Sequence, residues 1–343
     1  MALASAFLFG ASTPFAKLLL GDGVNPWLLA GILYLGSGIG LAGFQFARRL
    51  ADVPRSEAPL RRADLPWLGL VVLSGGVAGP VLLMLGLQST AAAPASLLLN
   101  LEGLATMAIA WTVFHENMDR RILIGAFSIL AGAIVLSWQG GPLGFGLGAL
   151  LIAGACLAWG IDNNLTRKLS GADPVQITTV KGLVAGSVNL ALALAAGAHL
   201  PGPLVLGGAA TLGFFAYGVS LVLFVFALRY LGSARTGAYF STAPFIGTVL
   251  AVVVLSEPVS PKLGIAAILM GIGLYLHLVE RHAHEHHHEA MEHEHRHVHD
   301  AHHQHAHGPD DPEGEPHTHR HQHAPLAHGH AHFPDLHHRH GHG

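Results

Sequence analysis

The sequence is poor in charge. Only 11% of its 343 residues are Asp, Glu, Lys or Arg, whereas an ordinary soluble domain has roughly 25%. Hydrophobic residues make up 51% of the chain, and its mean hydropathy is +0.46. Cysteine is almost missing too, and the single Cys156 excludes an intramolecular disulfide framework or a thiolate metal cluster within one chain. The composition therefore argues against a water-soluble globular protein.

Motifs of common enzyme classes are also missing. The chain contains no phosphate-binding loop, no nucleophile elbow and no zinc-protease motif. We therefore expect neither an enzyme nor an ATP-driven machine, and nothing in the sequence points to nucleic acid. Histidine is scarce before residue 277, where only His115 and His199 occur, yet 25 of the 27 histidines follow from His277 onward.

Long apolar runs fill the chain up to about residue 280. A helix needs about 20 mostly apolar residues to cross the hydrocarbon layer of a bilayer, because its backbone groups must be satisfied within the segment. Turn-forming stretches rich in Gly, Pro, Asn and Asp separate several of the runs. The sequence predicts an all-α integral membrane protein with ten transmembrane helices, at residues 2–20, 26–48, 66–88, 91–113, 121–139, 146–168, 174–197, 204–229, 234–256 and 261–280.

The first run is read as a retained span and not as a signal peptide. It has no basic leader, contains Pro14 and continues into Lys17 without a small-residue cleavage pattern. Basic residues in short loops set orientation, and with the N-terminus inside only Lys17 and Lys262 fall on the outer side. Both termini are therefore expected in the cytoplasm and the protein in the cytoplasmic membrane, with these basic residues inside: Arg48, Arg49, Arg55, Arg61, Arg62, Arg120, Arg121, Arg167, Lys168, Arg229 and Arg235.

The two halves of the apolar region resemble each other. Two glycines lie seven residues apart in both 122–132 and 262–271, and an acidic residue precedes each segment, Glu116 in one half and Glu257 in the other. Phe9-Gly10 in the first run is matched by Trp159-Gly160 in the sixth. Five spans per half is an odd number, so the second half is predicted to cross the membrane inverted relative to the first. The predicted domains are 1–140, 145–280 and a tail at 282–343.

At these residues the chain resembles the EamA-type proteins of the drug/metabolite transporter superfamily. The resemblance rests on the opening Phe-Gly-Ala-Ser-Thr-Pro-Phe-Ala-Lys, on the Trp-Gly of the sixth span, and on the acidic span ends followed by glycine-spaced helices. His115 and Ser256 replace the glycine usual before the acidic residue, and the proline usual in the fourth and ninth spans is present only as Pro244. The resemblance implies ten spans and secondary active transport, usually export, of small metabolites, amino acids or drugs.

Two ionisable residues stand out inside the predicted spans, where such groups are costly and often functional. Glu102 lies in the middle of the fourth span, and an unpaired carboxylate at that depth is expected to be protonated. It is interpreted either as a proton-coupling or cation-binding acid or as half of a buried charge pair. Lys181 in the seventh span is the natural partner for Glu102 or for an anionic substrate group, unless it extends to the membrane surface.

Further polar residues complete the predicted substrate pathway. Asp162, Asn163 and Asn164 are consecutive on the sixth span and cover too wide an arc to face only lipid. Asp162 has the alternative of pairing with Arg167 or Lys168 near the surface. Single polar residues in spans often only link helices by hydrogen bonds, but three more are expected to line a cavity: Asn100, Tyr239 and Ser241.

The tail at 282–343 is predicted to be disordered and metal-binding. It is dominated by His, Asp, Glu, Pro, Gly and Ala and has too few large apolar residues to form a core. Neutral imidazole is a good ligand for zinc, nickel, cobalt and cupric ions. The expected ligands alternate with other residues: His284, His286, His288, His293, His295, His297, His299, His317, His319, His321 and His323.

Three functions are weighed. The first is a proton- or gradient-coupled exporter of small molecules with a central cavity near Glu102, Asp162, Asn163 and Lys181. The second is a divalent-metal exporter whose tail collects or senses metal, and the third is a membrane metal sensor that moves nothing. Expected partners are the lipid bilayer, a small-molecule or ion substrate and divalent metal at the tail, with no required cofactor and a homodimer left open.

Overall fold

The helical bundle is built from ten successive helical stretches. The computed structural model describes residues 1–52, 59–114, 120–138, 145–166, 169, 172–278 and, in the tail, the backbone of 283–288, 291–297, 317–323 and 326–331. The first half contains α1 (Ala2–Gly21), α2 (Pro26–Leu50), η1 (Arg62–Asp64), α3 (Leu65–Val71), η2 (Val72–Ala78), α4 (Gly79–Ser89), α5 (Ala92–Leu98), α6 (Leu101–Phe114) and α7 (Arg120–Ser137). The second contains α8 (Leu147–Thr166), α9 (Pro174–Ala195), α10 (Pro203–Gly213), η4 (Phe214–Val219), α11 (Ser220–Phe240), α12 (Ala243–Val254) and α13 (Pro261–Leu278).

Eight of these stretches are long and apolar enough to cross a membrane, which confirms a multi-pass membrane protein. The other two are α8, which ends in the polar run Asp162-Asn163-Asn164, and α12, which has only 12 residues. Of the ten predicted crossings, eight have a helix of sufficient length and apolarity among the described residues, and the other two stay predictions.

Two helices, α2 and α9, start where the sequence supplies a side-chain cap. The Asn25 side chain accepts hydrogen bonds from the backbone N–H groups of Trp27 and Leu28 at the start of α2. Asp173 caps α9 in the same way, and each cap is followed by a proline at the first helical position. Such capping satisfies backbone donors that the first helical turn leaves free. The second helix of each half thus begins with the same local chemistry.

The boundary between the eighth and ninth predicted spans is wrong. The stretch 230–233, expected as a loop, is helical, and α11 continues to Phe240. The break falls instead at Ser241 and Thr242, directly before α12 with Pro244 near its start. Proline lacks the N–H group that would continue a preceding helix and is well placed in a first turn. The fourth predicted span is broken similarly at Leu99 and Asn100, between α5 and α6.

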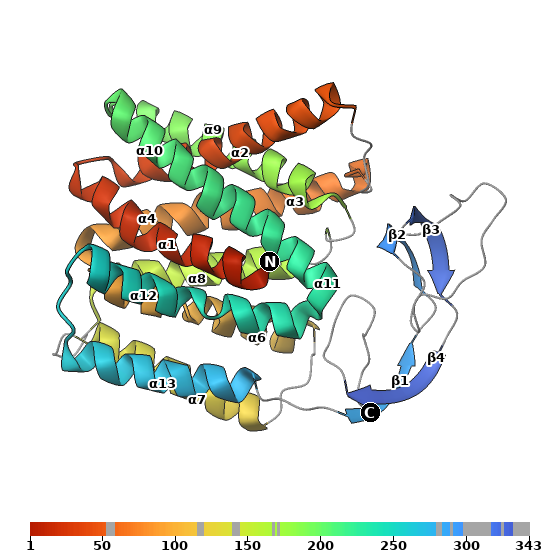
Figure 1. Cartoon of the computed structure of the whole chain (residues 1–343). Helices are drawn as coiled ribbons and strands as arrows, with labels where there is room; N and C mark the ends of the chain where they lie inside the picture. The colour runs from red at the N-terminus through yellow and green to blue at the C-terminus, as the bar shows by residue number, and fades with distance from the viewer. Residues whose placement is uncertain are drawn as a thin grey trace.

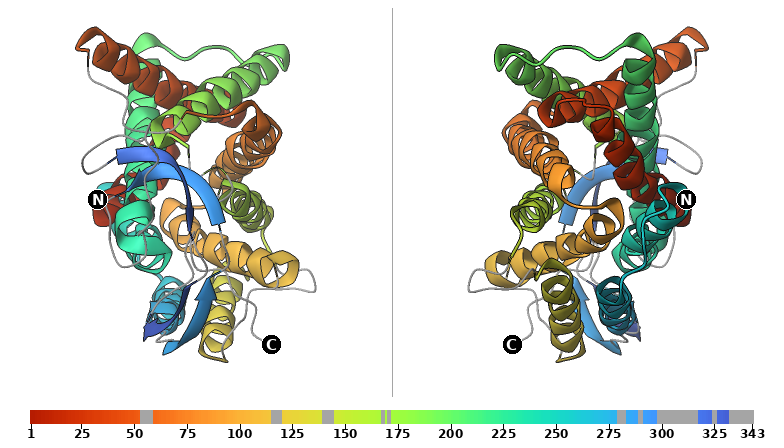
Figure 2. Two further views of the ribbon diagram at one scale, coloured as in Figure 1. Left: turned by 90° about the vertical axis from the view of Figure 1, so that its right-hand side faces the viewer. Right: turned by 90° about the vertical axis from the view of Figure 1, so that its left-hand side faces the viewer.

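Equivalent helices of the two halves lie against each other. Helix α2 packs on α9 at one edge of the bundle and α7 packs on α13 at the opposite edge, with α1, α4, α8 and α12 between them (Figures 1 and 2). Close approach of α2 and α9 depends on glycine, because a Cβ atom built on Gly182 would lie 2.6 Å from the backbone nitrogen of Gly38. Both halves also contain one π-helical stretch, η2 in the first and η4 in the second.

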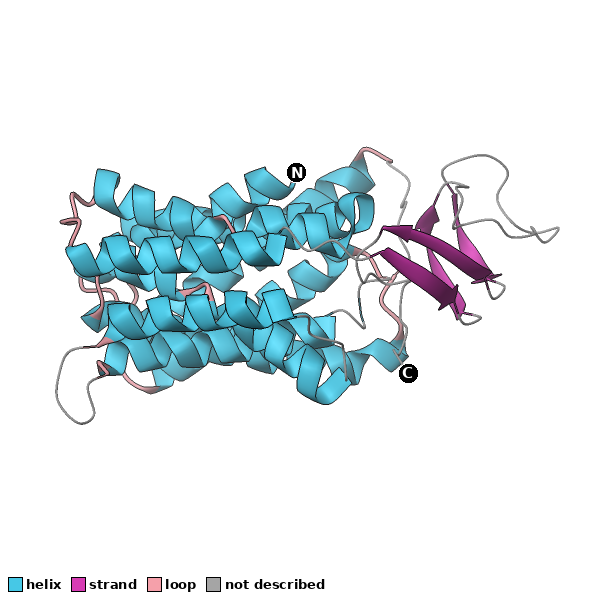
Figure 3. Cartoon of the chain, turned by 90° about the horizontal axis from the view of Figure 1, so that it is seen from below, coloured by secondary structure: helices cyan, strands magenta, loops and turns pink. Residues whose placement is uncertain are grey.

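Four short strands occur in the tail, beyond one end of the bundle (Figure 3). Strand β1 (Ala283–His288) pairs antiparallel with β4 (Leu326–Ala331), and β2 (Met291–His297) pairs antiparallel with β3 (His317–His323). The prediction of a wholly disordered tail therefore differs from the structure in these segments. In these segments histidine alternates with other residues, which is the two-residue period of a strand. The prediction of disorder rested on amino-acid composition and not on this period.

Candidate transport site

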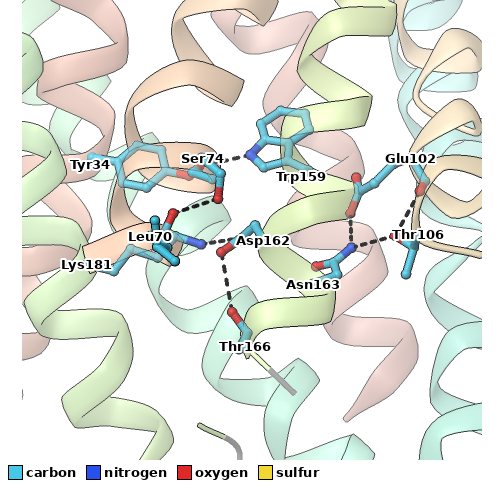
Figure 4. Close-up of polar contacts among 11 residues, drawn as sticks. Tyr34, Leu70, Ser74, Glu102, Thr106, Trp159, Asp162, Asn163, Thr166 and Lys181 are labelled. Atoms are coloured by element: carbon cyan, nitrogen blue, oxygen red, sulfur yellow. Dashed lines mark hydrogen bonds and ion pairs between the residues drawn. The ribbon is translucent and has the colours of Figure 1, made fainter. Parts of the chain in front are cut away.

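Asp162 and Lys181 form an ion pair inside the bundle. The Lys181 Nζ atom lies 2.5 Å from Oδ2 of Asp162, and each residue is only 6% exposed (Figure 4). The pair joins α8 to α9, and the Thr166 hydroxyl donates to the second carboxylate oxygen of Asp162 at 3.3 Å. Of the alternatives weighed for these residues, Lys181 pairs with Asp162 and not with Glu102, whereas Arg167 and Lys168, the other partners considered for Asp162, lie outside the described residues. The rotation of each helix about its own axis decides which residues become partners. The spacing of residues within one helix does not determine that rotation.

Glu102 lies on the neighbouring helix and has a neutral partner. It is the second residue of α6, just after the break at Leu99 and Asn100, and it is half-buried. The Asn163 side-chain amide donates to Oε1 of Glu102 at 2.9 Å and to the Thr106 hydroxyl at 3.2 Å (Figure 4). A carboxylate near a helix N-terminus is favoured by the helix dipole. The broken helix thus places this acid in the first turn of α6.

The three polar residues at the end of α8 face two different helices. Asp162 faces α9, whereas Asn163 and Asn164 contact α6. The Asn164 amide donates to the backbone oxygens of Thr106 at 3.0 Å and Gly160 at 2.8 Å. At least these parts of the polar arc face protein, as the sequence indicated, and they link the carboxylate of Glu102 to the ion pair through adjacent residues.

The π-helix η2 supplies part of the site that sequence reasoning missed. A π-turn leaves backbone oxygens available for other donors, and Gly75 O accepts from the Tyr34 hydroxyl at 2.7 Å and from Trp159 Nε1 at 3.0 Å. The next oxygen, of Gly76, accepts from the Asn189 amide at 3.0 Å. A Cβ atom on Gly75 would collide with the Asp162 carboxyl group. The signals in the sequence were the glycine doublet and the lone polar residues Tyr34 and Asn189 in apolar helices.

Aromatic side chains fill the centre of the bundle beside this network. The ring of Phe9 lies 6.2 Å from that of Trp159 and 6.0 Å from that of Tyr217, and the Tyr34 and Tyr217 rings are 5.3 Å apart. These rings therefore pack against one another between α1, α2, α8 and η4, and the predicted cavity near the ion pair stays a prediction. A cavity of about 520 Å³ lies elsewhere, between the α4–α5 connection and the ends of α7 and α8.

The remaining predicted pathway residues lie at the two helix breaks. Asn100 is buried and donates to Leu97 O at 2.8 Å. Tyr239 is 43% exposed, and its backbone oxygen accepts the hydroxyl of Thr242, next to Ser241.

The predicted metal ligands divide between the described strands and the rest of the tail. His284, His286 and His288 lie in β1, and His299 lies outside the described residues. The others lie in β2 and β3: His293, His295, His297, His317, His319, His321 and His323. Among residues whose side chains are described, no three His, Cys, Asp or Glu come together as a metal site.

Comparison with known proteins identifies the kind of protein. The sequence model of the EamA-like transporter family matches residues 1–138 and 146–279. An uncharacterized transporter of Methanothermobacter thermautotrophicus is 29% identical over 291 residues, which cover 80% of this chain and 84% of that protein. A probable 4-amino-4-deoxy-L-arabinose-phosphoundecaprenol flippase subunit, ArnE, of Salmonella newport is 32% identical over 105 residues, 31% of this chain and 93% of that protein.

A solved crystal structure supports the fold. The superposition covers 80% of this protein and 98% of the solved chain, with a TM-score of 0.58 and 21% sequence identity. At that identity the likeness concerns the arrangement of helices alone.

Proposed function

Because the chain belongs to the EamA-like transporter family, we propose that it is a secondary active transporter that exports small metabolites or drugs across the cytoplasmic membrane. The two stretches matched by the family model have odd numbers of predicted spans, which supports halves that cross the membrane in opposite directions. The equivalent breaks before Leu101 and Ala243, and the π-helix in each half, support the same repeat. In such transporters the solute site lies where broken helices of the two halves meet.

The observation that carries the proposal is the position of Glu102. The carboxylate lies at the start of a half-helix within the bundle and contacts Asn163, whose neighbour Asp162 is bound to Lys181. The Asp162–Lys181 pair is neutral as a unit. Glu102 has no ion-pair partner among the described residues, so its charge must be balanced by a proton or by a cation that arrives from outside.

This arrangement suggests how a gradient could be coupled to solute movement. When Glu102 is charged, Asn163 and the α6 N-terminus hold the carboxylate in place. When Glu102 is protonated, it gains a donor and no longer needs that support, so the contact between α6 and α8 weakens. Because α6 belongs to the first half and α8 to the second, protonation changes how the two halves hold each other, which is what alternating access requires.

The test compares Glu102→Gln with the intact protein in proteoliposomes that carry a pH gradient. The probes are a radiolabelled amino-acid pool and the cationic dye ethidium, with pyranine inside the vesicles to report proton movement. We expect gradient-driven accumulation to fall at least tenfold in Glu102→Gln, while solute exchange without a gradient continues. Loss of accumulation with retained exchange would indicate a role of Glu102 in coupling and not in packing, because a disrupted bundle would lose both accumulation and exchange.

Asp64→Asn is the matched control. Asp64 is a surface carboxylate that accepts the backbone N–H of Arg61 at 2.8 Å and lies outside the network, so its loss should leave accumulation unchanged. Full accumulation in Glu102→Gln would contradict the coupling role. A lack of flux of every probe through the intact protein would contradict the export of such solutes.

A further inference from the structure

The two central strands of the tail place histidine opposite histidine. In the antiparallel register of β2 and β3, His293 pairs with His321, His295 with His319 and His297 with His317. We call these six residues the His ladder. The outer pair of strands repeats the pattern on a smaller scale, with His284 opposite His330 and His286 opposite His328.

The register separates the histidines from the charged residues. Positions two apart share one face of a strand, so the His ladder occupies one face of the β2–β3 ribbon. The opposite face holds the positions between them, where Glu294 lies across from Arg320. Opposite charges at directly paired positions stabilise a sheet. A slip of one residue would place every ladder histidine opposite a residue that is not histidine. Both faces of the ribbon therefore favour a register in which histidine lies opposite histidine.

The spacing of a two-stranded ribbon suits a shared metal ion. Directly opposed Cβ atoms are about 4.5–5.5 Å apart, and same-face neighbours along a strand are roughly 6.6 Å apart. Two adjacent cross-strand pairs therefore place four histidines at neighbouring positions on one face of a ribbon. Zinc takes four nitrogen ligands at about 2.0–2.1 Å in a tetrahedral arrangement.

We propose that each ribbon of the tail binds one divalent metal ion of the zinc class through two neighbouring cross-strand histidine pairs. In the His ladder these are His293, His295, His319 and His321, and in the outer ribbon they are His284, His286, His328 and His330. An isolated two-stranded ribbon is only marginally stable in water. Because the proposed ligands come from both strands, metal binding stabilises strand pairing, and strand pairing favours metal binding. This proposal does not depend on what the helical bundle transports.

The first experiment counts zinc on the full chain, purified in detergent without an affinity tag, by competition with a chromophoric chelator. The intact protein should hold two zinc ions tightly. Substituting all six ladder histidines with Gln should remove one of them, or weaken it at least tenfold. The control substitutes six other tail histidines with Gln, and it should keep both ions: His302, His303, His305, His307, His337 and His338. An equal loss in both variants would overturn the proposal, because binding would then follow histidine number alone.

The second experiment measures register. Spin labels are attached at Glu292→Cys and Gln322→Cys, which are paired positions off the histidine face, in a Cys156→Ser background. Zinc should narrow the distance distribution to a short value, and the effect should vanish in the six-Gln ladder variant. A control pair at Glu292→Cys and Thr318→Cys is four positions out of register, about 13 Å along the strand, and should give a longer distance. Equal distances for both pairs, or no response to zinc, would contradict the ribbon site.

Discussion

At the scale of single residues, the buried ion pair is the most sensitive point of the molecule. Removing one partner of a buried pair leaves an uncompensated charge, which costs more than the pair itself contributes. Sequence reasoning selected Asp162, Lys181 and Glu102 because ionisable residues are rare in apolar spans. It did not name Asp162 as the partner of Lys181, since the rotation of α8 and α9 about their own axes depends on packing between helices and not on the spacing within either.

We therefore expect Asp162→Asn and Lys181→Met each to lower the free energy of unfolding by about 3–5 kcal/mol. The double variant Asp162→Asn/Lys181→Met should recover much of that loss, because neither charge is then left alone. Thermal unfolding in detergent of the two single variants and the double variant measures this directly. If the losses simply added, the 2.5 Å contact would not be the interaction that stabilises these residues.

At the scale of elements, hydropathy predicted where helices run but not how they are interrupted. The two-residue breaks and the π-helices η2 and η4 do not alter the apolar composition of a span. Their signals are local: Gly75-Gly76 in one half and Pro244 after the break in the other. Glycine content indicated close helix contacts, yet only the structure shows which glycines are in contact. Gly38 and Gly182 lie backbone to backbone, whereas Gly43 on the same α2 helix has open space around it.

This contrast gives a matched pair of substitutions. Gly182→Ala forces α2 and α9 apart, because its Cβ atom would lie 2.6 Å from a backbone nitrogen, and overpacking of this kind costs about 1–3 kcal/mol. Gly43→Ala meets nothing within 4 Å and should stabilise α2 by up to about 1 kcal/mol through helix propensity. Melting temperatures of both variants in detergent check the signs. A Gly182→Ala protein as stable as the Gly43→Ala protein would show that the helices separate without cost.

At the scale of the whole molecule, the sequence predicted the helical membrane bundle and its family, because long apolar runs and their repeat are visible without coordinates. It did not predict which aromatic rings meet at the centre of the bundle. Whether rings such as Phe9 and Tyr217 meet or leave a cavity depends on the relative position of two halves that are far apart in the chain. Contacts that join the halves are therefore where the conformational behaviour of the protein can be tested.

Glu257 makes such a contact. It follows α12 in the second half, and its two carboxylate oxygens accept the backbone N–H groups of Ala92 and Ala93 at 2.7 and 2.8 Å, at the start of α5 in the first half. Nearby, Lys17 of α1 donates to the backbone oxygen of Leu87 at the end of α4. The connection between α4 and α5 is thus held on both sides, by Lys17 of the first half and by Glu257 of the second. Glu116, its predicted counterpart, lies outside the described residues.

Glu257→Ala should release this connection while leaving the interior network intact. Two backbone donors lose a charged acceptor, and hydrogen bonds to charged groups contribute about 1.5–3 kcal/mol, so amide hydrogen exchange over residues 87–95 should become at least tenfold faster. Ser260→Ala is the control, because Ser260 lies with Glu257 between α12 and α13 and its hydroxyl accepts the Leu263 N–H at the start of α13, so its loss should leave the exchange of 87–95 unchanged. Equal protection of 87–95 in both variants would mean that the halves are held together elsewhere. Faster exchange confined to Glu257→Ala would identify this contact as the one that must open when the α4–α5 end of the bundle separates.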